Sequence, residues 1–328
     1  MANVIETFDL TKIYTTFFGT QRVLALDKVN LTVQRSEIFG FLGPNGAGKT
    51  TAVKVFLGLI FPTSGEVRIL GQRVTSPRVK RKIGYLPEGS YFPDFLRGEE
   101  VLEFYGHLYG LRGSDLQERI TATLDLVGLQ DARRILVRFY SKGMRQRIGL
   151  AQALLSDPDI LILDEPTTGL DPIARREIRD ILVKLKVERG KTLFICSHEL
   201  LEVELMCDRV AILDRGKVVK SGRLDEMVYS ERDVEIVAQG VSSELENRLR
   251  SENVAVSEAG RGTVRIEVPR EKGVFSVLRR IEQDSAELIS MSPRKESLED
   301  IFLHAVRGST QERDATPNAK SKAVGSED

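Results

Sequence analysis

A glycine-rich segment that ends in a lysine and two threonines is the first place where this sequence could do chemistry. Residues 43–51 read GPNGAGKTT, which fits the spacing G-x-x-x-x-G-K-[ST]. Glycines let backbone N–H groups of such a loop approach phosphates closely, with no side chain in the way. A lysine there reaches the outer phosphates, and a threonine hydroxyl can bind Mg²⁺. We therefore predict that Thr50 binds Mg²⁺ and that a nucleotide is bound by Gly43, Pro44, Asn45, Gly46, Ala47, Gly48, Lys49, Thr50 and Thr51.

Two acidic residues follow an apolar run in ILILDEP, residues 160–166. The run is typical of a buried strand, which places Asp164 and Glu165 at its carboxyl end, the edge where ligands of open α/β sheets bind. Asp164 suits a Mg²⁺ ligand acting through water, and Glu165 suits a residue that polarises an attacking water. Such a pair is common at strand ends, but after the glycine-rich segment it predicts a hydrolytic site.

The elements around these residues predict an α/β fold. Residues 1–35 alternate apolar and polar positions, as antiparallel strands do, and residues 99–155 have helical spacing. EIFGFLG, DILILDEP and TLFICSH read as buried strands alternating with helices, which favours a parallel sheet covered on both faces. Asp171 is a plausible N-cap before Pro172, at the start of the helix between the last two strands.

The sequence pattern changes near residue 226. The remainder reads as β-α-β-β-α-β and then a helix that begins with a capping box at Ser297 and Asp300. We predict a main domain over 1–225 with a helical part at about 89–157, a small α+β domain over 226–307, and a disordered tail over 308–328, because that tail has almost no apolar residues.

Composition excludes several classes of protein. The 328 residues carry 48 basic and 48 acidic side chains, so we expect no nucleic-acid partner. Two cysteines form no disulfide framework or metal spacing, which favours a reducing cytosol. The N-terminus lacks the pattern of a signal peptide, and no apolar run approaches the ~20 residues of a membrane span. If the protein serves a membrane, another chain must cross it.

Six motifs, in order and spacing, resemble the ATP-binding cassette (ABC) family of ATPases over roughly residues 4–225. Each is short, but the set is specific. They are GPNGAGKTT and ILILDEP, YLPE at 85–88, YSKGMRQR at 140–147, GLDP at 169–172 and CSHE at 196–199. The resemblance implies a P-loop NTPase of ABC type with an antiparallel β subdomain and a helical subdomain, followed here by the small α+β domain. It also implies a homodimer that closes head to tail around two ATP molecules.

The resemblance assigns roles to further residues. Ser141 and Gly143, in a signature segment that also holds Lys142 and Met144, would contact the γ-phosphate of ATP held by the partner. A serine at a helix start suits an anion, although it is also a common N-cap. Asp171 would contact the opposite subunit, and Tyr14 would stack on adenine. His198 would bond the γ-phosphate and orient the water, and Glu88 would bind Mg²⁺ or water.

Three positions depart from the usual family pattern. The family signature reads LSGGQ, whereas the third and fifth positions here are Lys142 and Met144, and Glu88 replaces a glutamine. These variants resemble bacterial drug, antibiotic and lipid exporter ATPases that are encoded separately from their permease. The resemblance implies a cytoplasmic subunit on the inner face of the membrane that binds a permease and not the transported substrate.

The permease would dock on the helical part near residues 89–110. Its candidate contacts are Tyr91, Phe92, Phe95 and Phe104, although ordinary helix packing explains such residues equally well. A soluble ABC ATPase of a non-transport assembly or regulatory complex remains an alternative. One P-loop and the absence of long heptads argue against the translation and chromosome types. The C-terminal domain could also sense a ligand or regulate the ATPase.

Overall fold

The computed structural model describes residues 2–15, 22–89, 91–260, 262–269, 273–295 and 297–314. They form two compact units, which are described separately below. The first unit extends to Leu224 and includes the last helix from Phe302 onward, and the second covers Asp225–Ile301.

A sheet in the order β10-β9-β3-β8-β7-β6 forms the centre of the first unit, counted over the described residues. All of these strands run parallel except β10, which pairs antiparallel with β9. Every residue of β3, β7 and β8 is buried, which explains their continuous apolar sequences. The strands are β3 (Ile38–Leu42), β6 (Ile83–Leu86), β7 (Ile160–Asp164), β8 (Thr192–Ser197), β9 (Arg209–Asp214) and β10 (Lys217–Arg223).

A second, antiparallel sheet has the order β2-β1-β4-β5 and shares a hydrophobic core with the first. Helix α1 (Lys49–Phe56) contributes to the same core, in which Phe56 and Phe41 contact Phe194 of β8 with ring centroids 5.3 and 5.4 Å apart. The strands are β1 (Asn3–Thr15), β2 (Arg22–Gln34), β4 (Ser64–Ile69) and β5 (Gln72–Arg73). The predicted antiparallel pair in residues 1–35 is therefore confirmed.

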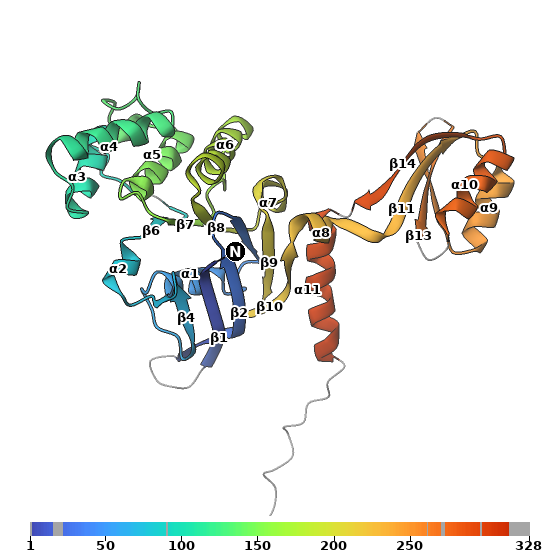
Figure 1. The fold of residues 1–328 in the computed structure, drawn as a ribbon, viewed down its shortest axis with the longest axis horizontal. Helices are drawn as coiled ribbons and strands as arrows, with labels where there is room; N and C mark the ends of the chain where they lie inside the picture. Colours follow the sequence, from blue (N-terminus) through green and yellow to red (C-terminus); the bar gives the residue numbers. More distant parts are fainter. Residues whose placement is uncertain are drawn as a thin grey trace, which may run out of the picture. The chain divides into compact units, whose positions relative to one another are not determined.

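Most helices of the first unit follow β6 or alternate with the parallel strands. In Figure 1, α3, α4 and α5 gather into the helical subdomain, apart from β1, β2 and β4. The helices are α2 (Pro77–Lys80), α3 (Gly98–Leu108), α4 (Gly113–Leu126), η1 (Val137–Phe139), α5 (Lys142–Leu154), α6 (Pro172–Arg189) and α7 (Leu200–Met206), while α8 (Leu224–Val228) begins at the last residue of this stretch and continues into the second unit.

The second unit is a four-stranded antiparallel sheet, order β12-β13-β11-β14, with α9 and α10 packed on it (Figure 1). Its element order confirms the predicted β-α-β-β-α-β pattern. Buried Ile236, Ile266 and Val268 of the sheet pack with Leu249 and Ile281 of the helices. The elements are β11 (Tyr229–Gln239), α9 (Ser243–Ser251), β12 (Ala255–Gly260), β13 (Thr263–Pro269), α10 (Val274–Gln283) and β14 (Glu287–Lys295).

The last helix, α11 (Leu298–Asp314), differs from the sequence prediction at its end. It begins with the predicted capping box, since Asp300 N donates to Ser297 Oγ over 3.1 Å. However, it continues past residue 308, where we predicted a disordered tail to begin. A polar composition does not exclude helix, and Pro317 is the first proline after Ser297. The remainder of that predicted tail, 315–328, lies outside the described residues.

Candidate functional site

The glycine-rich segment leads directly from buried β3 into α1, which begins at Lys49. Gly46 and Gly48 have φ angles of 80° and 113°, a region that residues with a Cβ rarely adopt. A Cβ on Gly48 would also collide with the carbonyl oxygen of Ala25, and one on Gly43 with that of Leu213. The loop therefore needs glycine at positions 46 and 48 for the positive φ angles, and at positions 43 and 48 because neighbouring backbone atoms leave no room for a Cβ.

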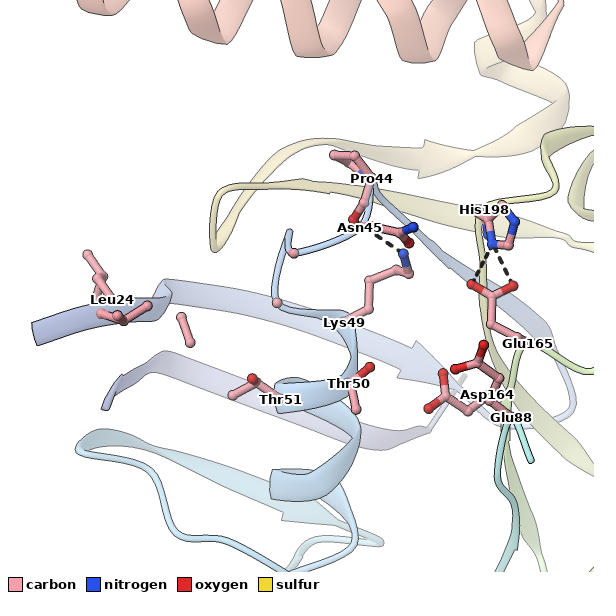
Figure 2. Close-up of a pocket in the computed structure, with 14 residues that line it drawn as sticks. Leu24, Pro44, Asn45, Lys49, Thr50, Thr51, Glu88, Asp164, Glu165 and His198 are labelled. Carbon is pink, nitrogen blue, oxygen red and sulfur yellow. Dashed lines mark hydrogen bonds and ion pairs between the residues drawn. The ribbon is translucent and has the colours of Figure 1, made fainter. Parts of the chain in front are cut away.

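The Lys49 side chain folds back along this loop. Its Nζ donates to Gly43 O over 2.6 Å and to Pro44 O over 3.4 Å, and the side chain is largely buried (Figure 2). These carbonyls hold an ammonium group beside the backbone N–H groups at the start of α1. The arrangement concentrates positive charge where a phosphate would lie.

Acidic residues at or just after the ends of the neighbouring strands β6 and β7 line the same cavity as the glycine-rich loop. Strands β6 and β7 pair in parallel, with Leu86 opposite Leu163, so the residues that follow them lie at one sheet edge. Figure 2 shows the Asp164 and Glu88 carboxylates beside each other, on the side of the pocket near Thr50. Burial, together with the charges of Glu165 and Glu88, raises the pKa of Asp164 to about 6.

These oxygen donors fit a magnesium ion. Crowded carboxylates next to a hydroxyl favour binding of a hard cation, which relieves the repulsion that raises the Asp164 pKa. No group of three or more His, Cys, Asp and Glu residues within the described ranges makes a metal site by itself. Mg²⁺ typically takes one or two carboxylates and completes its shell with water and phosphate oxygens. A site at Thr50, Asp164 and Glu88 fits that coordination preference.

Glu165 and His198 form a bonded pair at the ends of β7 and β8. His198 Nδ1 lies 2.8 Å from Glu165 Oε1, and the backbone N of His198 donates to Glu165 Oε2 over 3.4 Å. Glu165 is buried and has a φ angle of 52°, in the left-handed region that non-glycine residues seldom occupy. Its backbone N bonds Cys196 O over 2.9 Å, which holds that conformation against β8. Such strain is typical of functional positions.

One cavity of about 290 Å³ brings these groups together. Gly43 and Ala47 do not line it, because both loop residues are buried on the side away from the cavity, and a Cβ on Gly43 would collide with Leu213 O. The predicted residues that line it are Pro44, Asn45, Gly46, Gly48, Lys49, Thr50, Thr51, Glu88, Asp164, Glu165 and His198.

Sequence reasoning missed part of the cavity wall. Val23, Leu24 and Ala25 of β2 also line it, and Figure 2 shows Leu24 at the end remote from Asp164. This apolar surface is suited to the flat face of a nucleobase. The signal in the sequence is the unbroken apolar run of residues 23–26 at the start of an otherwise alternating strand.

Tyr14 does not line the cavity. It pairs with Val23 across β1 and β2, its side chain is exposed, and Lys12 Nζ lies 5.2 Å from its ring centroid. Its predicted stacking on adenine stays a prediction.

The signature segment lies outside this cavity and begins α5. Ser141 is the N-cap, because its Oγ accepts from Met144 N over 3.2 Å. Gly143 is buried against α6, where an added Cβ would lie 2.9 Å from Ala174 Cβ. Lys142 Nζ covers Gly169, so a side chain at position 169 would collide with it. The segment predicted to be the signature therefore does not line this cavity.

Asp171 caps α6 as predicted. Its Oδ1 accepts from Ala174 N over 2.9 Å, and the residue is exposed. Its proposed contact with a second subunit is compatible with this capping role.

Three of the four predicted docking aromatics are open to solvent. Tyr91, Phe95 and Phe104 are 93%, 75% and 55% exposed. Phe92 is half-buried and packs edge-on against Tyr105 with centroids 6.1 Å apart. Phe104 also packs edge-on against Tyr105, with centroids 5.4 Å apart, so helix packing accounts for part of this group. Across the described part of the chain, none of the helices has the length and apolar character required to span a bilayer.

The chain is similar to known proteins. A family model described as ABC transporter matches residues 26–168. An uncharacterised ABC transporter ATP-binding protein of Synechocystis sp. is 41% identical over 309 residues, 93% of this chain and 85% of that protein. The bacitracin transport ATP-binding protein BcrA of Bacillus licheniformis is 35% identical over 324 residues, 94% of this chain and 99% of that protein.

Solved structures match about two thirds of the chain. The dimer of the ATP-binding cassette MJ0796 in a post-hydrolysis state, bound to ADP and Pi, has a TM-score of 0.61 and 27% identity. The match covers 67% of this chain and 98% of that one. A structure described as an ATP-binding subunit of an ABC transporter has a TM-score of 0.60 and 32% identity, over 68% of this chain and 91% of that chain.

Proposed function

Since this chain belongs to the family of ABC transporter ATP-binding proteins, we propose that it powers a membrane exporter by closing around ATP as a homodimer. Its first unit is an ABC-type P-loop fold, and the chain is an ATPase of that family. The proposal concerns what this ATPase drives, how its subunits pair and which residues perform hydrolysis.

The observation that carries the residue assignment is the convergence of Lys49, Glu165 and His198 on one cavity. Lys49 supplies positive charge for the β- and γ-phosphates, and the loop backbone supplies donors. Glu165 accepts the proton of the attacking water, because its carboxylate lines the same cavity as Lys49. His198 holds that carboxylate through Nδ1 and offers its other ring nitrogen to the γ-phosphate or the water.

We assign Mg²⁺ to Thr50, Asp164 and Glu88. When bound, the ion would neutralise phosphate charge as the leaving group departs. Replacement of the family glutamine by Glu88 adds a negative charge at this position, so the site here holds two carboxylates.

Homodimerisation is supported by the position of the signature segment. Neither Ser141 nor Gly143 lines the cavity of its own chain, and Ser141 is exposed at the start of α5, where it could meet the ATP of a second copy. The neighbour of known structure that resembles this unit is a dimer. We infer that Asp171 contacts the partner in the same closed state.

Export and a separate permease are supported by two observations. The relative BcrA is described as a bacitracin transport ATP-binding protein. The exposed aromatics Tyr91, Phe95 and Phe104 give the helical subdomain an apolar surface that suits a protein partner. We infer a position on the inner face of the membrane, where ATP is available, with the transported substrate bound by the permease.

Glu165→Gln tests the catalytic assignment. This isosteric variant should bind ATP, lose at least about a hundredfold in turnover through loss of the base, and accumulate an ATP-bound dimer in size-exclusion chromatography. Turnover near that of the wild type would exclude Glu165 as the base.

Co-purification tests the partner. Recovery of the chain with an integral membrane protein supports export. Recovery with only non-membrane proteins would instead favour the alternative of a soluble non-transport assembly or regulatory complex.

A further inference from the structure

Glu199, the residue after His198, has contacts that the nucleotide cavity does not explain. It precedes α7, yet its carboxylate does not cap that helix. The side chain is only 16% exposed, and it turns toward the segment that follows Glu165. Neither Glu199 nor its partners line the cavity.

Both oxygens of the Glu199 carboxylate are engaged. Thr167 Oγ1 donates to Oε2 over 3.2 Å, and Arg175 Nη2 of α6 lies 3.4 Å from Oε1. Arg175 in turn donates from Nε to Leu170 O over 3.0 Å. Glu199 therefore holds residues 167–170 at both ends, directly through Thr167 and through Arg175 at Leu170.

Residues 167–170 form a tight turn that is also bonded to the proposed base. Leu170 N donates to Thr167 O over 3.3 Å, and Gly169 has a φ angle of 69°. Thr168 Oγ1 donates to Glu165 Oε2 over 2.9 Å. The turn thus connects Glu165 on one side to Glu199 on the other, and Asp171 follows immediately.

We propose that Glu199 is a positioning residue that ties the segment carrying His198 to the 167–170 turn, and so holds Glu165 and Asp171 in the geometry that hydrolysis requires. This inference rests on the roles given to Glu165, His198 and Asp171 under the proposed function. Contact between Asp171 and a second subunit would then be transmitted through this turn to the pair that activates water.

The charge of Glu199 matters for this role. The planar guanidinium of Arg175 contacts the Glu199 carboxylate and the Leu170 carbonyl at the same time. A neutral residue at position 199 would leave the positive charge of Arg175 half-buried without an ionic partner. Glutamine at position 199 has the size of glutamate and keeps one acceptor oxygen, but it gives Arg175 no negative charge. The turn should then be held less firmly, while the phosphate loop is unchanged.

A second ion pair, between α6 and α7, provides a matched control. Arg179 Nη1 of α6 donates to Glu202 Oε2 of α7 over 3.1 Å, and this carboxylate is buried as well. The described contacts of this pair do not include the 167–170 turn. Glu202→Gln therefore removes a neighbouring ion pair of α6 that has no described contact with the turn.

The test compares ATP turnover and thermal unfolding of the full chain with Glu199→Gln and Glu202→Gln. We expect Glu199→Gln to lower kcat by about tenfold or more, with KM for ATP changed less than about threefold, because misplacing the reacting groups costs rate and not ground-state binding. Glu202→Gln should keep kcat within about twofold of the wild type even if it lowers Tm.

Two results would overturn the proposal. One is a wild-type kcat in Glu199→Gln, and the other is an equal loss of kcat in both variants, which would indicate a general effect of loosening α6 against α7. If Glu199→Gln does not fold, Thr167→Val and Arg175→Lys take its place. Each removes one bond of the network, and wild-type kcat in both would equally reject the proposal.

The outcome is separable from that of the proposed function. Glu165→Gln reports on the base whatever Glu199 does. Loss of turnover in Glu165→Gln with normal turnover in Glu199→Gln rejects only the positioning role. Normal turnover in Glu165→Gln rejects the assignment on which it rests.

Discussion

His198 Nδ1 lies 2.8 Å from Glu165 Oε1, although the two residues are far apart in sequence and come from the ends of adjacent strands. When Glu165 is ionised its carboxylate can only accept, so Nδ1 carries the proton of this bond. Nε2 is then the nitrogen that can meet a ligand. This bond fixes the tautomer as well as the direction of the ring, and it orients the carboxylate toward the cavity.

Replacement of His198 should separate binding from hydrolysis. His198→Ala removes the group that holds Glu165, and we expect turnover to fall about a hundredfold, with ATP affinity changed much less. Single-turnover hydrolysis and equilibrium binding of a fluorescent ATP analogue measure the two quantities. His107→Ala is the control, since that exposed histidine lies on α3. A tenfold loss of affinity with unchanged single-turnover rate would contradict the role given to His198.

Lys49→Ala should weaken nucleotide binding itself. The lost ammonium makes charge-assisted bonds to phosphate oxygens, each worth about 1.5–3 kcal/mol, so Kd should rise by tenfold or more. Isothermal titration with ATP measures the change, and Lys54→Ala on the same helix is the control because Lys54 does not line the cavity. Wild-type affinity in Lys49→Ala would reject the phosphate-loop assignment.

Gly48→Ala should damage the loop more than a glycine substitution elsewhere. The added Cβ meets Ala25 O and is placed on a residue with φ 113°, so we expect a loss of about 1–3 kcal/mol in the free energy of unfolding and loss of ATP binding. Gly71→Ala is matched, because Gly71 has φ 72° with open space around its Cβ position. Urea unfolding of both variants separates backbone strain from collision. Equal losses would show that the collision with Ala25 has no consequence.

Removal of divalent cations should stop turnover and leave the fold intact. Thr50, Asp164 and Glu88 supply too few ligands to hold an ion without phosphate, so chelation should not lower Tm in the absence of nucleotide. Added Mg²⁺ should restore hydrolysis, and Asp164→Asn should raise the Mg²⁺ concentration needed for half-maximal rate by about tenfold or more. Full activity in excess chelator would contradict the assignment.

The exposed aromatic surface should govern membrane association. A triple Tyr91→Ser, Phe95→Ser and Phe104→Ser variant removes large apolar groups that face solvent, so ATP turnover of the purified chain should stay within about twofold. Its recovery in the membrane fraction of the native cells should fall. Leu59→Ser with Phe61→Ser, also exposed but outside the helical subdomain, is the control. Unchanged membrane recovery in the triple variant would reject this docking surface.

The sequence by itself determined the phosphate loop, the strand that carries Asp164 and Glu165, and the alternation of strands with helices. Each depends on local rules, namely backbone dihedrals available to glycine and the periodicity of buried residues. The β-α-β-β-α-β order of the second unit was accessible for the same reason. The end of α11 was not, because composition does not distinguish a polar helix from a tail.

Only the tertiary structure decided which distant residues meet. Val23, Leu24 and Ala25 enter the cavity wall because β2 passes over the phosphate loop, and Tyr14, chosen from motif position, does not line that wall. Glu199 acquires a role through Thr167 and Arg175, which no local pattern connects to it. Contacts of this kind depend on which strand ends are neighbours and on how α6 packs against α7, and both are set by the packing of the whole core rather than by any segment alone.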